Sequence, residues 1–119
     1  MSLTTEQTVE KYYASWNSGN IDSMREVLSK DLVFRGPMEQ HDSSEDFISS
    51  CKKMAENPDF RQFKIQPVNC LVQGEEACYF YRLANGKAVP EVPMAEYFKI
   101  KAGKIQEIRL YFDARAFAG

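Results

Sequence analysis

The hydrophobic period of this chain changes near Arg61, and that change limits the folds it can adopt. Before Arg61 apolar residues recur every three or four positions, as on one face of a helix. After Arg61 they alternate with polar residues, as in a half-buried strand. Helices followed by an antiparallel meander indicate the α+β class, with one sheet face wrapped around the helices.

Local signals set the expected element boundaries. Thr4 and Gln7 approximate a capping box, and Gly19 in the segment NSGN (17–20) can end the first helix in the left-handed conformation. A second helix is expected at about 21–29, and a third from Ser43 or Ser44 to Asn57-Pro58. Strands are expected at roughly 61–73, 76–84, 93–101 and 104–113, separated by turns at Gly74-Glu75, Asn85-Gly86 and Ala102-Gly103.

Two further segments are unusual. The stretch LVFRGPMEQH (32–41) begins as an apolar strand, bends at Gly36-Pro37 and reaches the only histidine, His41. In VPEVP (89–93), Pro90 and Pro93 cannot donate to a ladder, so this segment is expected at a sheet edge or a bulge.

Length and composition indicate one globular domain, residues 1–119. The net charge is −2 with no basic stripe, which disfavours nucleic-acid binding. No apolar stretch is long enough to cross a bilayer, and the N-terminus lacks the pattern of a secretory signal. The three cysteines show no CxxC spacing, so we expect buried free thiols, no disulfide framework, no zinc site and a cytoplasmic location.

Two strings, YYASWNSGNIDSMREVLSKDLVFRGP and EYFKIKAGKIQEIRLYFDARAF, resemble the SnoaL-like domains of the nuclear transport factor 2-like superfamily. Ketosteroid isomerase and limonene epoxide hydrolase belong to the same group. The likeness covers most of residues 5–117 and implies a cone-shaped α+β barrel. In such a barrel, N-terminal helices pack in a curved, mainly antiparallel sheet around one apolar pocket. It also implies a homodimer formed through the sheet face.

The resemblance also suggests catalytic positions. Tyr12 matches the hydrogen-bonding tyrosine of ketosteroid isomerase, and Glu96 matches its second functional acid. The position of the general-base aspartate is occupied by Gly36, which can transfer no proton. Epoxide hydrolysis is disfavoured, because Phe34, Gly36 and Leu110 stand where limonene epoxide hydrolase has its tyrosine, asparagine and aspartate.

Alternation places Glu96 among Met94, Phe98 and Ile100 on one strand face. Loss of water there would raise its pKa and suit it to general acid/base work, unless Arg82 or a lysine pairs with it. His41 stands in a loop that can cover the pocket mouth, but it has no second histidine to build a metal site, so neither metal nor cofactor is expected. The expected ligand contacts are Trp16, Phe34, Arg35, Met38, His41, Arg82, Leu110 and Phe112.

Three functions follow from these observations. The first is an isomerase or cyclase that transfers protons on a carbonyl-bearing or polycyclic compound, with Glu96 as acid/base and Tyr12 orienting the oxygen. The second is a non-catalytic domain that binds an apolar small molecule, as the glycine at position 36 suggests. The third is a protein-interaction module. A homodimer is expected through a sheet face carrying Tyr79, Tyr81, Tyr97, Arg109 and Tyr111.

Overall fold

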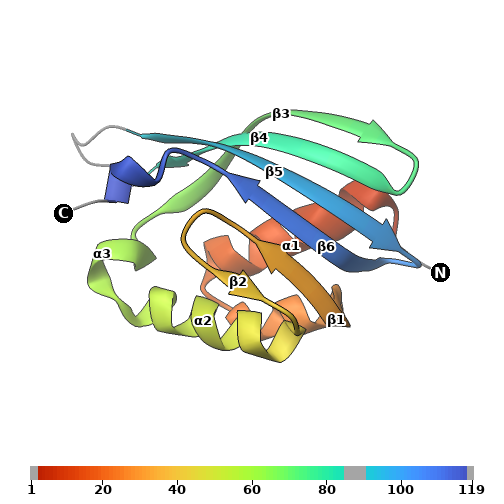
Figure 1. Ribbon diagram of the computed structural model, residues 1–119, viewed down its shortest axis with the longest axis horizontal. Coiled ribbons are helices and arrows are strands. Elements are labelled where there is room, and N and C mark those ends of the chain that lie inside the picture. Colours follow the sequence, from red (N-terminus) through yellow and green to blue (C-terminus); the bar gives the residue numbers. More distant parts are fainter. Residues whose placement is uncertain (1–2, 85–90, 118–119) are drawn as a thin grey trace.

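The computed structural model describes residues 3–84 and 91–117, which form helices packed against one side of a curved sheet (Figure 1). The helical elements are α1 (Thr5–Ser18), the 3-10 helix η1 (Ile21–Glu26), α2 (Ser44–Glu56), α3 (Pro58–Arg61) and the 3-10 helix η2 (Ala114–Phe117). The strands are β1 (Leu28–Arg35), β2 (Gln40–His41), β3 (Lys64–Gln73), β4 (Glu76–Ala84), β5 (Val92–Lys101) and β6 (Lys104–Tyr111).

The sheet has six strands in the order β2-β1-β6-β5-β4-β3. Neighbouring strands are antiparallel except β1 and β6, which run parallel. The sheet is therefore mixed and unclosed, and the expected α+β class is confirmed. Figure 1 shows α1 crossing one face of the sheet and α2 lying beside the β1–β2 hairpin.

Caps and turns explain most element boundaries. The Thr4 side chain accepts from the Gln7 backbone N–H, and the Gln7 side chain accepts from the Thr4 N–H, so the capping box is confirmed. Gly19, with φ of 78°, ends α1 in the left-handed conformation. Ser43 caps α2 by accepting from the backbone N–H of Asp46, and Asn57 ends that helix.

The expected second helix is wrong in extent and type. Residues 21–26 form a 3-10 helix, and β1 begins at Leu28, four residues before the expected strand start at Leu32. The pairing of Leu28 with Ile105 of β6 explains this difference, because that contact depends on distant sequence. A short helix, α3, also precedes β3, so β3 begins at Lys64 and not near Arg61.

Pro93 lies where its strand is paired on one side only. Pro93 lies in the interior strand β5 opposite Arg82 of β4, but the register with β6 begins only at Ala95. At Pro93 the ladder therefore joins β5 to β4, and no β6 bond needs its missing N–H. The hairpin expected at Asn85-Gly86, together with Pro90, lies outside the described residues.

The inner sheet face and the helices form the core. Met94, Glu96, Phe98 and Ile100 are all buried, as the alternation of β5 predicts. Tyr79 and Tyr81 are also buried on this side, which corrects their expected place on an exposed dimer face. Their rings pack edge-on against Tyr13 of α1, so they belong to the core beneath the helix. The three cysteines are free thiols, with Cys51 buried and Cys70 and Cys78 half-buried.

Candidate functional site

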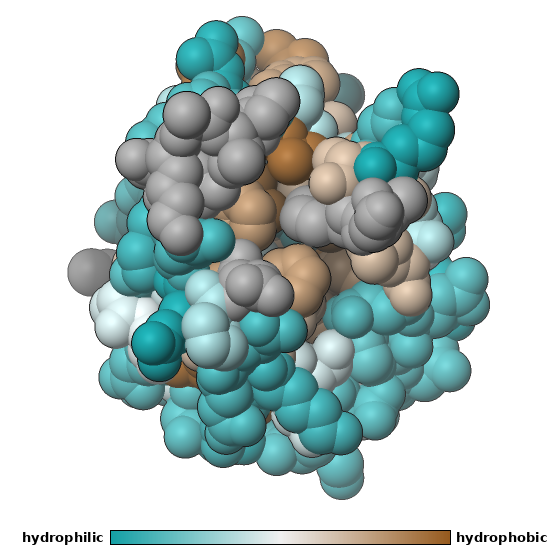
Figure 2. Space-filling view, turned by 90° about the vertical axis from the view of Figure 1, so that its left-hand side faces the viewer, coloured by the Kyte–Doolittle hydropathy of each residue, from teal (hydrophilic) through white to brown (hydrophobic). Residues whose placement is uncertain are grey.

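A cavity of about 300 Å³ lies between the helices and the inner face of the sheet. Figure 2 shows apolar residues gathered in a hollow at the end of the molecule where α3 and η2 lie, with hydrophilic residues around it. A hollow of this volume is at the small end of the range for small-molecule sites. Its lining is mostly aromatic or aliphatic: Tyr12, Trp16, Met24, Phe34, Gly36, Pro37, Met38, Glu39, Phe47, Cys51, Met54, Phe60, Phe63, Ile65, Tyr81, Leu83, Met94, Glu96, Leu110 and Phe112.

Glu96 is the deepest charged group of this lining, with an exposed fraction of 2%. The Tyr13 hydroxyl donates to its Oε1 at 3.0 Å, and Tyr81 forms a second side-chain hydrogen bond with it. Burial raises the pKa of Glu96 to about 8, although both tyrosine hydrogen bonds act in the opposite direction. At neutral pH the carboxyl group is therefore mostly protonated and can donate a hydrogen bond.

Tyr12 lines the cavity, but the hydrogen bond to Glu96 comes from its neighbour Tyr13. The Tyr12 ring stacks on Phe47 and meets Phe98 edge-on. Burial, followed by the nearby Glu96 carboxylate, raises the pKa of Tyr12 well above its ordinary value, so its hydroxyl remains protonated. The expected pairing of Glu96 with Tyr12 is thus not found. Tyr13 and Tyr81 hydrogen-bond the Glu96 carboxyl group, and Tyr12 lies within electrostatic range of it.

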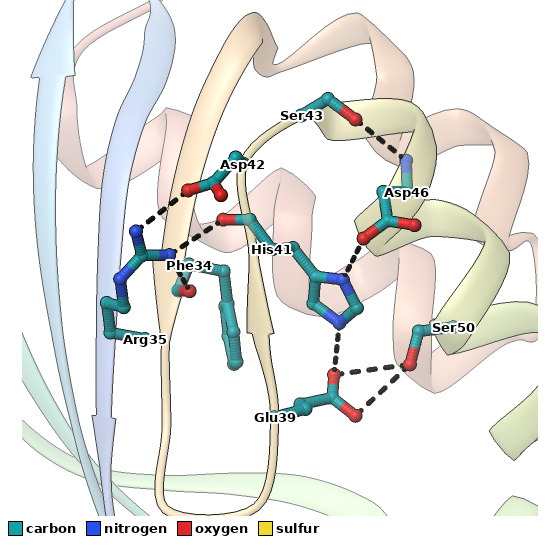
Figure 3. Close-up of polar contacts among 8 residues, drawn as sticks. All are labelled: Phe34, Arg35, Glu39, His41, Asp42, Ser43, Asp46 and Ser50. Atoms are coloured by element: carbon teal, nitrogen blue, oxygen red, sulfur yellow. Dashed lines mark hydrogen bonds and ion pairs between the residues drawn. The ribbon is translucent and has the colours of Figure 1, made fainter.

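A second carboxylate, Glu39, also lines the cavity and was not among the expected site residues. It lies between β1 and β2 and accepts from the Ser50 hydroxyl of α2 at 3.2 and 3.1 Å through its two oxygens. His41 Nε2 lies 3.0 Å from Oε1 of Glu39, and His41 Nδ1 lies 2.5 Å from Oδ2 of Asp46 (Figure 3). The sequence signal that could have identified Glu39 is its position three residues after Gly36, in the bend over the pocket.

His41 stands behind Glu39 and is not part of the cavity lining. Its ring packs against Phe34 and Phe47. Burial alone would lower its pKa, but hydrogen bonds and charge from Asp46 and Glu39 outweigh burial and raise the pKa above its ordinary value. His41 therefore keeps its ring proton to higher pH than a free imidazole does, between the carboxyl groups of Asp46 and Glu39.

The other predicted contacts divide into two groups. Arg35 lies beside the site: its guanidinium donates to the backbone oxygens of Phe34 and His41 and pairs with Asp42 at 2.7 Å. Arg82 is exposed and pairs with Glu91 at 3.6 Å, so the structure places it away from the cavity. The reason is strand alternation, which turns Tyr81 inward and Arg82 outward. The remaining predicted contacts do line the cavity: Trp16, Phe34, Met38, Leu110 and Phe112.

Gly36 occupies a tight place in the lining. A Cβ added there would lie 3.2 Å from Cε1 of Phe34 and 3.6 Å from the backbone oxygen of Glu39. A side chain at this position requires the Phe34 ring to move by a few tenths of an ångström. The position that the resemblance matches to the base of ketosteroid isomerase is therefore crowded by the Phe34 ring, and the carboxyl group of this bend that lines the cavity is Glu39.

The described residues form neither a membrane-spanning helix nor a cluster of metal-binding side chains. Within residues 3–84 and 91–117, no helix combines the length and apolar character needed to cross a membrane. In the same part of the chain, no group of three or more histidine, cysteine, aspartate or glutamate side chains is arranged to hold a metal ion.

Solved structures share this fold at low sequence identity. An NTF2-like protein of unknown function from Cytophaga hutchinsonii is 23% identical, with a TM-score of 0.84 over 100% of this chain and 98% of its own. A proposed SnoaL-like polyketide cyclase from Jannaschia sp. is 19% identical, with a TM-score of 0.80 over 96% and 88%. A proposed ketosteroid isomerase from Kribbella flavida is 16% identical, with a TM-score of 0.76 over 92% and 77%. These identities support the fold alone.

Comparison with curated protein sequences finds no match. The profile of the SnoaL-like domain matches residues 9–108, which include most of α1, all six strands in part or whole, and both glutamates of the cavity. The chain therefore belongs to the SnoaL-like domain family.

Proposed function

We propose that this protein binds a small, largely apolar carbonyl compound and catalyses proton transfer on it, as an isomerase or a cyclase would. The observation that carries the proposal is Glu96, a carboxyl group that is 2% exposed, held by two tyrosines and open to an apolar cavity. The names of the neighbours from Jannaschia and Kribbella flavida point to the same class of chemistry.

The role of Glu96 follows from its protonation. Because its pKa is about 8, the group carries a proton at neutral pH while its oxygens accept from tyrosines. Its own O–H can then donate to a carbonyl oxygen in the cavity, where little water competes for the bond. Such a donor stabilises the negative charge that develops on oxygen when a neighbouring C–H bond loses its proton. Tyr12, protonated and in the same lining, is the second candidate donor.

The lining also defines the charge of the ligand. Among the described lining residues the ionisable side chains are Glu39, Glu96, Cys51 and two tyrosines, and none is basic. An anionic ligand would meet the Glu39 carboxyl group and no basic side chain in the lining itself, which costs free energy in a site of low polarity. A neutral ketone or polycyclic carbonyl compound fits this lining better than a free acid or a phosphate.

Proton exchange on 2-tetralone, a bicyclic ketone with acidic protons beside its carbonyl group, tests the proposal. The protein should accelerate deuterium incorporation at that carbon in D₂O, followed by NMR, above the buffer rate. Glu96→Gln should lower the protein-dependent rate at least tenfold, because the proton donor is lost while the shape is kept. Glu56→Gln, an exposed change on α2, is the matched control and should leave the rate unchanged.

A non-catalytic ligand-binding domain is the second candidate, favoured by Gly36 at the position of the usual base. Native mass spectrometry of the freshly purified protein separates the two functions. An apolar molecule that co-purifies and is recovered unchanged, together with no exchange activity on 2-tetralone, supports the binding domain and contradicts the enzyme.

We also infer that two copies associate through the outer face of the sheet. Two of the residues expected on this face, Tyr79 and Tyr81, point into the core. Of the expected residues, Tyr97, Arg109 and Tyr111 lie on the outer face, which also carries the exposed Leu71 and Phe80. Aromatic and aliphatic side chains of this kind are enriched in the cores of protein interfaces.

A further inference from the structure

We infer that Glu39 is the base of this site, and that His41, Asp46 and Ser50 hold its carboxylate toward the cavity. This inference rests on the proposed function, because it names the group that accepts the substrate proton. Glu39 would take the role of the general-base aspartate that the resemblance matches to Gly36, from three residues further along the same bend.

The placement of Glu39 comes from three elements (Figure 3). The residue lies in the turn between β1 and β2, Ser50 projects from α2, and His41 ends β2. Ser50 contacts both carboxylate oxygens, whereas His41 contacts Oε1 only, at 3.0 Å. The carboxylate is thus fixed on one side and keeps an acceptor position on Oε2 for a ligand. Its side chain is 30% exposed and lines the cavity, so it can reach both a ligand and solvent.

The two cavity carboxyl groups have opposite surroundings. Glu96 is buried and accepts from tyrosine hydroxyls, while Glu39 is partly exposed and contacts the His41 ring and the Ser50 hydroxyl. Burial is the largest cause that raises the pKa of Tyr12 and of Cys51, and Glu96 and Glu39 also raise both. These two side chains therefore lie within electrostatic range of both glutamates. Two carboxyl groups in such different surroundings, one buried among tyrosines and one at the partly exposed side of the cavity, can divide the roles of acid and base.

Glu39 and Glu96 are sufficient for the proposed proton transfer. A C–H bond beside the carbonyl breaks, and its proton goes to Oε2 of Glu39. The C–H electron pair forms a C=C bond, and the C=O π pair moves to oxygen, which accepts a hydrogen bond from Glu96. The carboxyl proton on Glu39 can then exchange with solvent, and a solvent proton delivered to the same carbon completes hydrogen exchange. If the proton is delivered to another carbon, the compound is isomerised.

His41 is a positioning residue in this arrangement. The charged groups that face it are Glu39 and Asp46, which contact its ring, and Arg35, which donates to its backbone oxygen. Arg35 is paired with Asp42, so among the described residues His41 is the basic side chain in contact with Glu39. Loss of the imidazolium should release the Glu39 side chain without removing the carboxylate itself.

The test combines exchange on 2-tetralone with binding of the same ketone, measured by quenching of Trp16, the only tryptophan and a lining residue. Glu39→Gln should lower the exchange rate about a hundredfold or more while affinity changes by no more than about twofold. His41→Ala should lower the rate less, about tenfold, and His41→Gln, which keeps a donor near Nε2, should recover part of that loss. Glu56→Gln is the control.

The outcomes separate this inference from the proposed function. If the wild-type protein and Glu56→Gln exchange, Glu96→Gln is slow and Glu39→Gln is as fast as wild type, then Glu39 is not the base but proton transfer stands. If the wild-type protein binds 2-tetralone and shows no exchange, the proposed function fails, and the inference fails with it. If His41→Gln is no faster than His41→Ala, the positioning role of His41 is overturned.

Discussion

At the scale of the residue, burial of Glu96 links the candidate chemistry to the stability of the fold. The group binds its proton more tightly when folded, since its pKa rises from the ordinary 4.5 to about 8. Below the lower value both the folded and the unfolded states are protonated, and the group does not favour either. As pH rises between these values the unfolded chain ionises first, and the folded state loses stability relative to it.

We therefore predict that the free energy of unfolding falls as pH rises from about 5 to about 8. The contribution of Glu96 is roughly 5 kcal/mol at most, because each pKa unit corresponds to about 1.4 kcal/mol. His41, whose pKa is also raised, adds a fall in the same direction. Urea unfolding of the wild type and Glu96→Gln at both pH values isolates the carboxyl group. The variant should show a much flatter dependence, and equal slopes for both proteins would contradict the burial argument.

Which of two adjacent tyrosines holds Glu96 could not be predicted from the sequence. Tyr12 and Tyr13 both belong to the apolar stripe of α1, and both are buried. Successive residues of a helix point about a quarter turn apart. Tyr13 therefore meets Tyr81 of β4 while Tyr12 meets Phe47 of α2, and both rings contact Phe98 of β5. The rotation of α1 on the sheet decides between them, and that rotation depends on packing that no local pattern records. Glu96 itself could be predicted, because strand alternation fixes its face.

At the scale of the element, the end of α1 is tied to the edge strand β3. The Asn17 side chain accepts from the Ile65 N–H at 2.8 Å and donates to the Ile65 oxygen at 3.1 Å. The neighbouring Trp16 donates its indole N–H to the backbone oxygen of Phe63 at 3.2 Å. These bonds satisfy backbone groups at the start of an edge strand and place the Trp16 ring in the cavity lining.

We predict that Asn17→Ala lowers the free energy of unfolding by about 2 kcal/mol, because the amide and carbonyl of Ile65 lose partners at a half-buried place. Asn20→Ala, at an exposed position whose side chain does not cap η1, should cost less than about 0.5 kcal/mol. Chemical denaturation of both variants measures the difference. Equal losses would show that the Asn17 bridge adds nothing beyond the general cost of changing the turn.

The helices and the meander were predictable because their signals are local. The Thr4 capping box, Gly19 and the Ala102-Gly103 turn each act within a few residues, and each appears as expected. The parallel pairing of β1 with β6 joins residues about 75 positions apart, such as Leu28 and Ile105, and is not encoded in any short pattern. Glu39 was missed for a different reason: its partners His41 and Ser50 are near in sequence, but they meet it only because α2 packs beside the β1–β2 turn.

At the scale of the whole molecule, the outer face of the sheet is the surface that needs an explanation. Leu71 is 62% exposed and Tyr111 is 57% exposed. Phe80 lies opposite Ala95, which lies opposite Tyr111, so these side chains form one row across three strands. Leu71 lies opposite Cys78, two residues before Phe80 on the same face. Apolar residues thus extend from the edge strand β3 to β6.

We predict a homodimer in sedimentation velocity at micromolar concentration, with this face buried between the two copies. A stable interface buries about 800 Å² on each partner, an area that needs a broad surface such as this sheet face. Phe80→Glu places a charge in the middle of the row and should shift the protein to monomer with its fold intact, as circular dichroism would show. Leu3→Glu, an equally exposed apolar residue before α1, is the control and should leave the dimer unchanged. A wild-type monomer at this concentration, or a Phe80→Glu variant that remains dimeric, would contradict an interface on the outer face.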